Sequence, residues 1–139
     1  MFRWIFYVLV AVLVAALLTV FISVSEETRA PLGQEFALSI GQVVFIQDEE
    51  LSVRFTSVTE DSRCPRGATC VWEGRVSCLV QLTDETSSSP MLLTAPGLTE
   101  QYSEEQFKEY HLLFQVTPYP EIDKQIAEKL YRLLMVVSR

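Results

Sequence analysis

The feature that most constrains this chain is a long apolar run near its N-terminus. From Trp4 to Val24 there are 21 residues without a charge, and 19 of them are apolar. As an α-helix, such a run measures about 30 Å, the thickness of the hydrocarbon core of a bilayer. Trp4 and Tyr7 stand near its start, where amphipathic rings favour the membrane interface. The run therefore predicts a transmembrane signal-anchor helix over residues 1–25.

The charges beside the run predict its orientation. Arg3 and the α-amino group precede it, whereas Glu26 and Glu27 follow it. The positive-inside rule places the N-terminus in the cytoplasm and the domain that follows on the extracytoplasmic side, in the periplasm or at the cell surface. A cleaved signal peptide is the alternative, with cleavage after the small residues at 23–25. Against it, the run is longer than the roughly 7–15 residues of a usual signal core.

The rest of the chain has the character of one acidic globular domain. Apolar residues make up 49% of the whole chain, and the N-terminal run accounts for the excess over an ordinary domain. All 18 acidic residues and all but one of the 11 basic residues lie beyond the run. This balance argues against a nucleic-acid partner bound by phosphate neutralisation.

Beyond a polar linker at 26–35, apolar residues recur mainly with a period of two. The clearest example is the alternation of Leu51, Val53 and Phe55 with polar residues. Similar alternation is found at 36–40, 76–82 and 110–116. Seven or so short strands within 36–139, separated by turn residues, predict a mainly β domain. Its expected architecture is a small antiparallel β-sandwich or barrel.

Three segments carry less regular patterns. The acidic stretch 48–50 is typical of a hairpin tip. Ser103 to Lys108, with acids directly after the serine, predicts one helical turn. Residues 122–132 fit a helix face and a strand equally well, so we expect a short helix or turn to about Lys129 and then a final strand.

Three cysteines, Cys64, Cys70 and Cys78, lie within fifteen residues. Outside the cytoplasm a disulfide can persist. Pro65 and Gly67 favour a tight reversal between the first two, which makes Cys64–Cys70 the favoured pair. Cys70–Cys78 is the alternative, and it requires a return between strand and loop. Cys78 lies on the apolar face of a predicted strand, where a free thiol behaves as a small hydrophobe.

The cysteines belong to a longer motif, Asp61-Ser62-Arg63-Cys64-Pro65-x-Gly67-x-x-Cys70-x-Trp72-x-Gly74. It resembles the signature of a largely uncharacterised family of small exported or membrane-anchored bacterial proteins. In that family a Pro-Tyr-Pro segment, here 118–120, often follows a later strand. The resemblance covers about residues 36–137 and implies an exported β-rich domain with the Cys64–Cys70 bridge. It implies no catalytic residues, and Arg75 and Cys78 depart from its pattern.

The motif is best explained as a staple for a small core. A short disulfide ring restricts the unfolded chain by an amount worth roughly 2–3 kcal/mol. We expect Trp72 to pack on the bridge or on the sheet, and Gly74 to permit a close backbone approach or a bulge. Asp61 is expected to cap the loop or to pair with Arg63 or Arg66.

The sequence offers little for catalysis. Its one histidine, His111, lies on the exposed side of a predicted strand, and no phosphate loop, Ser–His pair or metal-spaced His/Cys cluster is present. We therefore expect no enzymatic activity, no cofactor and no catalytic or metal-binding residues. Weaker hypotheses are a Ca²⁺ site at a carboxylate cluster, redox chemistry at Cys64 and Cys70, and a protease inhibitor that presents Arg66.

These patterns together predict a membrane-anchored interaction module. Its partners would be the lipid bilayer and other membrane-protein subunits of a larger complex, to which it contributes contacts rather than chemistry. Ala11, Ala15 and Ala16 lie near one side of the predicted anchor, which is compatible with helix packing. The alternative is an exported module that binds a soluble ligand.

Overall fold

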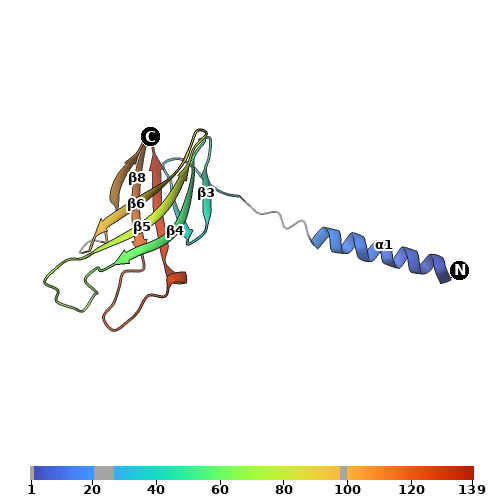
Figure 1. Ribbon diagram of the computed structural model, residues 1–139, viewed down its shortest axis with the longest axis horizontal. Helices are drawn as coiled ribbons and strands as arrows, with labels where there is room; N and C mark the ends of the chain where they lie inside the picture. The colour runs from blue at the N-terminus through green and yellow to red at the C-terminus, as the bar shows by residue number, and fades with distance from the viewer. Residues whose placement is uncertain (1, 21–26, 98–99) are drawn as a thin grey trace.

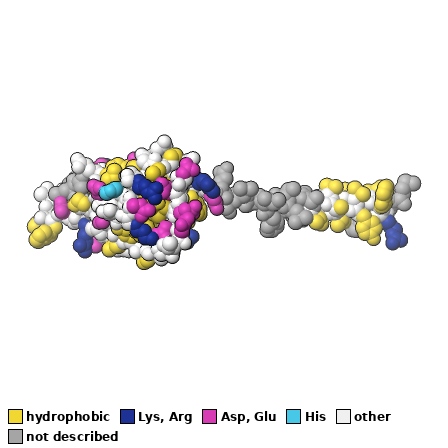
Figure 2. Space-filling model, turned by 90° about the horizontal axis from the view of Figure 1, so that it is seen from above, with side chains coloured by type: hydrophobic (Ala, Val, Ile, Leu, Met, Phe, Trp, Pro, Cys, Tyr) yellow, Lys and Arg dark blue, Asp and Glu magenta, His cyan; other side chains and the backbone are white. Residues whose placement is uncertain are grey.

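The computed structural model describes residues 2–20, 27–97 and 100–139, and it shows one helix followed by a β-domain (Figure 1). The helix, α1, spans Phe2–Val20. Its side chains that the structure describes are all exposed, and they are mostly apolar (Figure 2). Within the described ranges, no helix combines the length and the apolar character needed to span a membrane. Val24, expected in the anchor, lies outside these ranges.

The strands form two sheets. The first has five strands in the order β1-β3-β4-β5-β6, and its neighbours are antiparallel except for β1 and β3, which are parallel. These strands are β1 (Thr28–Ala30), β3 (Val43–Ile46), β4 (Ser52–Asp61), β5 (Arg75–Thr83) and β6 (Ser88–Pro96).

The second sheet has four strands in the order β2-β9-β8-β7, all antiparallel. These strands are β2 (Glu35–Ser39), β7 (Ser103–Phe107), β8 (Tyr110–Thr117) and β9 (Arg132–Ser138). A short 3₁₀ helix, η1 (Glu128–Leu130), precedes β9.

One hydrophobic core lies between the two sheets. Val53 and Phe55 of β4 and Leu112 and Phe114 of β8 are fully buried in it. Because successive side chains of a strand point to opposite faces, each alternating segment places its apolar residues in this core. The prediction of a mainly β fold with largely antiparallel sheets is confirmed.

Two elements differ from the sequence prediction. The expected linker at 26–35 contains β1, which pairs with β3 and buries Ala30. The helical turn predicted at Ser103–Lys108 is wrong, because this segment is β7 and pairs with β8. Lys108 has a φ of 52° and begins the turn into β8. The short helix before a final strand is confirmed by η1 and β9.

The strand pairing shows that the start of the β-domain and the β4–β5 connection lie at different levels along the sheet. Thr28 lies beside Val44, which in turn pairs with Val53 of β4. Asp61, at the end of β4, pairs with Val76, six residues along β5 from the Leu82 that pairs with Val53, which is about 20 Å along the sheet at 3.3 Å per residue. The β4–β5 and β8–β9 connections both project from the end of the domain opposite the C-terminus (Figure 1).

Candidate functional site: the cystine loop

The cystine loop, residues 62–74, connects β4 to β5 and contains most of the sequence motif. Its disulfide joins Cys64 and Cys70, with a Cα–Cα distance of 5.9 Å, so the favoured pairing is confirmed. Cys64 is buried at the base of the loop. Cys78 is free and buried in the core, where desolvation raises the pKa of its thiol to about 12.

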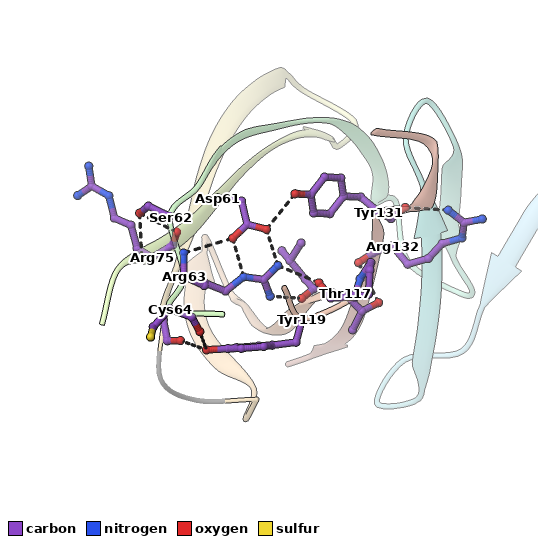
Figure 3. A network of polar contacts seen from close by, with 12 residues as sticks. Asp61, Ser62, Arg63, Cys64, Arg75, Thr117, Tyr119, Tyr131 and Arg132 are labelled. Atoms are coloured by element: carbon purple, nitrogen blue, oxygen red, sulfur yellow. Dashed lines mark hydrogen bonds and ion pairs between the residues drawn. The ribbon is translucent and has the colours of Figure 1, made fainter. Parts of the chain in front are cut away.

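Arg63 holds the base of the loop to the second sheet, and its side chain is only 3% exposed. Its guanidinium binds Asp61 through two bonds, Nε to Oδ1 at 2.8 Å and Nη2 to Oδ2 at 2.6 Å. It also donates to the carbonyl oxygens of Val116 at 2.8 Å and Pro118 at 2.9 Å (Figure 3). The planar, five-donor guanidinium suits this arrangement, in which one residue links β4, β8 and the β8–β9 connection.

The Asp61 carboxylate has a further hydrogen-bond partner in the connection between β8 and β9. The hydroxyl of Tyr131 donates to Asp61 Oδ2 at 2.9 Å (Figure 3). Burial, followed by this hydrogen bond, raises the pKa of Tyr131 to about 12. Asp61 therefore pairs with Arg63, one of the two partners expected for it, and does not pair with Arg66.

Tyr119 fills the space beside the disulfide. Its hydroxyl donates toward the carbonyl oxygens of Cys64, at 2.9 Å, and Gly97. The guanidinium carbons of Arg63 and Arg66 lie 5.1 Å and 5.5 Å from its ring centroid, within the range of cation–π contacts. The ring therefore packs under the loop, and its hydroxyl ties the loop to the end of β6.

Arg66 joins the loop to neighbouring segments through its backbone and its side chain. Its amide donates to the Pro120 carbonyl at 3.0 Å, and its own carbonyl accepts from the Ile122 amide at 3.0 Å. Its guanidinium pairs with Glu100, with Nε at 2.8 Å from Oε1, and this interaction raises the pKa of Arg66.

Two glycines permit the turns of the loop. Gly74 has a φ of +70°, and a Cβ there would lie 1.7 Å from the Ser62 carbonyl oxygen. Gly67 has a φ of +89°, which follows Pro65 within the disulfide ring. The close backbone approach predicted at Gly74 is confirmed, and it leaves no room for a side chain there, whereas the positive φ of Gly67 favours glycine.

Trp72 projects into solvent, so its predicted packing on the bridge or the sheet is wrong. It is 83% exposed, and the neighbouring Val71 is 91% exposed. The physical reason is that Tyr119 already occupies the place beside Cys64, and Gly74, two residues after Trp72, turns the chain back toward β5. The loop thus presents two adjacent apolar side chains on a base that is fixed by the disulfide and by Arg63.

Sequence reasoning identified most residues of this site but missed two tyrosines. Tyr119 lies in the Pro-Tyr-Pro segment that the family resemblance included without a role. Tyr131 was part of a segment whose structure the pattern left ambiguous. Both come from the β8–β9 connection, far from the motif in sequence, and only the packing of the two sheets brings them to Asp61 and Cys64.

The other residues that the sequence singled out lie apart from the loop. His111 is half exposed, and its Nδ1 lies 3.4 Å from Glu104 Oε1. Within the described chain, no group of three or more His, Cys, Asp or Glu residues is placed to hold a metal ion. Trp4 and Tyr7 are on α1, where they are 80% and 64% exposed.

No family model matches this chain, and neither a curated protein nor a solved structure matches it.

Proposed function

We propose that this protein is a non-enzymatic, membrane-anchored interaction module. In this proposal the β-domain lies on the extracytoplasmic side and serves as an accessory subunit of a larger membrane complex. The cystine loop is its docking element, and the exposed side chains of Val71 and Trp72 insert into an apolar pocket of the partner. The observation that carries the proposal is the 83% exposure of Trp72 on a loop with a fixed base.

An exposed tryptophan is a large unused source of binding energy. A Trp side chain buries about 150–250 Å² in a contact, which at about 25 cal/mol per Å² is worth several kcal/mol. Tryptophan is also among the residues most enriched at the energetic centres of protein interfaces. Trp72 contributes little to the fold of its own domain, so a role in contact with another molecule explains its place in the loop.

The anchoring of the loop favours tight binding. A flexible loop loses conformational entropy when a partner orders it, whereas a loop already fixed in place does not. The cystine loop is fixed by the Cys64–Cys70 bridge, by the buried Arg63 and by the Tyr119 hydroxyl. These contacts act on its base and leave Val71 and Trp72 free to meet a partner.

The charge of the domain favours a protein over a lipid surface as the partner of the loop. Beyond residue 24 the chain has eighteen acidic residues and ten basic ones. Acidic and basic side chains are interspersed on the surface seen in Figure 2. Anionic membrane surfaces attract clusters of basic residues and repel net negative charge. The exposed basic residue of the loop, Arg66, is already paired with Glu100.

The anchor is supported by the sequence of residues 4–24, which is uncharged throughout. The β4–β5 connection begins about 20 Å along the sheet from the level of Thr28. A domain tethered through its N-terminus could thus present the cystine loop to a second subunit. Mass spectrometry of the mature N-terminus tests the anchor, because a chain that starts near Glu26 would contradict it.

Co-purification tests the docking role of the loop. The full-length chain is extracted from its native membranes in a mild detergent, as wild type, as Trp72→Ala and as Leu130→Ala. Leu130 is a matched control, because it is also apolar and 52% exposed but lies in η1. We expect a partner to co-migrate with the wild type and with Leu130→Ala, and to be lost from Trp72→Ala. A wild-type chain that migrates alone would contradict the proposal, as would equal retention by Trp72→Ala.

A further inference from the structure

A second surface of the domain has the chemistry of a ligand site. The outer face of the five-stranded sheet contains a hollow of about 660 Å³, lined by side chains of β3, β4, β5 and β6. It is the face that turns away from the core, since Val44, Val53 and Leu82 on the same strands point inward and are fully buried. None of the residues that line it is acidic, although the domain as a whole is.

Two cross-strand rows form the floor of the hollow. In one row Phe45 pairs with Ser52, Ser52 with Thr83, and Thr83 with Ser88. In the adjacent row Arg54 pairs with Gln81. Phe45 and Arg54 are diagonal neighbours across β3 and β4, a relation that puts their Cβ atoms about 7–8 Å apart. One small ligand can therefore contact both.

The hydroxyl and amide groups of this floor are held in place. Gln81 Nε2 donates to Ser88 Oγ at 2.8 Å, and Thr83 Oγ1 lies 2.8 Å from the same Ser88 oxygen. Each of these groups has hydrogen-bonding capacity beyond those two contacts. The Phe45 ring beside them is 37% exposed, although β3 is an interior strand of the sheet.

Arg54 differs from the other arginines of the β-domain. Five of them form an ion pair with a carboxylate, namely Arg29, Arg63, Arg66, Arg75 and Arg139. The sixth, Arg132, donates to the carbonyl oxygens of Lys129 and Tyr131. The Arg54 side chain makes no hydrogen bond or ion pair within the part of the chain that the structure describes, and it lies in a hollow without acidic residues. Its five donors are thus available to an anionic group, which a guanidinium can bind in a bidentate manner.

We propose that this hollow binds an oligosaccharide whose sugars carry a carboxylate. The exposed Phe45 ring can pack against the apolar C–H face of a sugar ring, and Gln81, Thr83 and Ser52 can exchange hydrogen bonds with its hydroxyls. Arg54 receives the carboxylate. At its Phe45 end the hollow adjoins the acidic residues Glu49 and Glu50, so the carboxylate lies toward Arg54 and uncharged hydroxyls lie toward Phe45.

The composition of the hollow favours a saccharide over a protein. Protein interfaces are enriched in large aromatic residues, methionine and arginine and depleted in serine. This hollow contains one aromatic ring among small hydroxyl side chains, and its flat floor of amide and hydroxyl groups matches the many hydroxyls of a sugar. Sheet faces of β-sandwich and barrel domains serve as oligosaccharide sites in other folds.

Titration calorimetry of the full-length chain in detergent micelles tests this proposal, with oligogalacturonate as the acidic probe and a neutral gluco-oligosaccharide of equal length as its comparison. We expect the acidic probe to bind and the neutral one to bind at least about tenfold more weakly, since a charge-assisted bidentate contact is lost. Arg54→Gln should weaken binding of the acidic probe by a similar factor, and Phe45→Ala should also weaken it, whereas Phe45→Tyr should preserve it.

Arg75→Gln is the matched control, because it removes the same charge from the exposed start of β5, six residues from Gln81 and outside the hollow. It should leave binding of the acidic probe unchanged, and thermal unfolding of each variant verifies that it is folded. The proposal is overturned if oligogalacturonate does not bind at millimolar concentration. It is equally overturned if Arg54→Gln binds as the wild type does, or if the neutral probe binds as tightly as the acidic one.

Discussion

Arg63 is the residue that ties the cystine loop to both sheets. Among the residues that the structure describes, it is the one buried charged side chain, and it donates to one carbonyl oxygen of β8 and to another in the connection that follows β8. Asp61 neutralises it, and Tyr131 completes the coordination of the Asp61 carboxylate. The sequence suggested the Asp61–Arg63 pair because the two residues are close along the chain. Its burial depends on β8 and could not be predicted from the motif.

The Arg63 contacts predict a large loss of stability when this residue is replaced. Arg63→Met would leave the Asp61 carboxylate, whose side chain is 9% exposed, without its cation. Breaking a buried pair from one side costs about 3–5 kcal/mol of unfolding free energy. Arg75→Met is the matched control, because its pair with Glu60 is exposed and should be worth less than about 1 kcal/mol. Urea denaturation measures both, and equal losses would contradict this role of Arg63.

Gly74 gives a second prediction at this scale. Gly74→Ala should destabilise the domain strongly, because its Cβ would lie 1.7 Å from a backbone oxygen of Ser62. Gly33→Ala is the control, since Gly33 has a similar φ of +76° but nothing within 4 Å of its Cβ. Gly33→Ala should lower the free energy of unfolding by only about 1–2 kcal/mol, because alanine disfavours the left-handed backbone conformation. Thermal unfolding compares them, and a Gly74→Ala chain as stable as the control would show that the loop can move away.

The strands differ in how far their own residues determine them. β4, β5 and β8 have alternating apolar residues that the core buries, so periodicity alone predicted them. β1 has three residues with one buried, and β7 is polar with two glutamates, so neither carries a detectable pattern. Both are edge strands whose conformation is set by the neighbour that they pair with. Their local sequence therefore resembled a linker in one case and a helical turn in the other.

Strand β5 gives a prediction of pH dependence through Cys78. Burial raises the pKa of this thiol from 9.0 to about 12. In the unfolded chain the thiol ionises above about pH 9, whereas in the folded domain it does not, so the folded state retains the proton that the unfolded state has lost. The stability that Cys78 contributes is therefore complete below pH 9 and is lost as the pH rises toward 12.

Chemical denaturation between pH 8 and about 11 checks this sign. The wild type should lose more stability over this range than Cys78→Ala, which has no thiol to ionise. Tyrosines such as the half-buried Tyr131 contribute to the decline in both chains, because their pKa values are raised as well. Identical pH slopes for the two chains would show that the thiol does not contribute.

For the whole molecule, the decisive arrangement is the contrast between a fixed loop base and an exposed loop tip. The sequence motif predicted the disulfide and the close turn at Gly74, which are local features. The motif could not predict the exposure of Trp72, because this exposure depends on Tyr119 of the β8–β9 connection, which occupies the space beside Cys64. Trp72, which the motif spacing assigned to a structural role beside the disulfide, is therefore the centre of the proposed docking surface.

The direct test of that surface is site-specific photocrosslinking in intact membranes. A photoreactive phenylalanine analogue replaces Trp72 in one full-length chain and Leu130 in another, since both side chains are exposed but only the first lies at the loop tip. We predict one discrete crosslinked protein from position 72 and none from position 130. The absence of a crosslink at position 72, or the same products from both positions, would contradict the claim that the cystine loop docks a partner subunit.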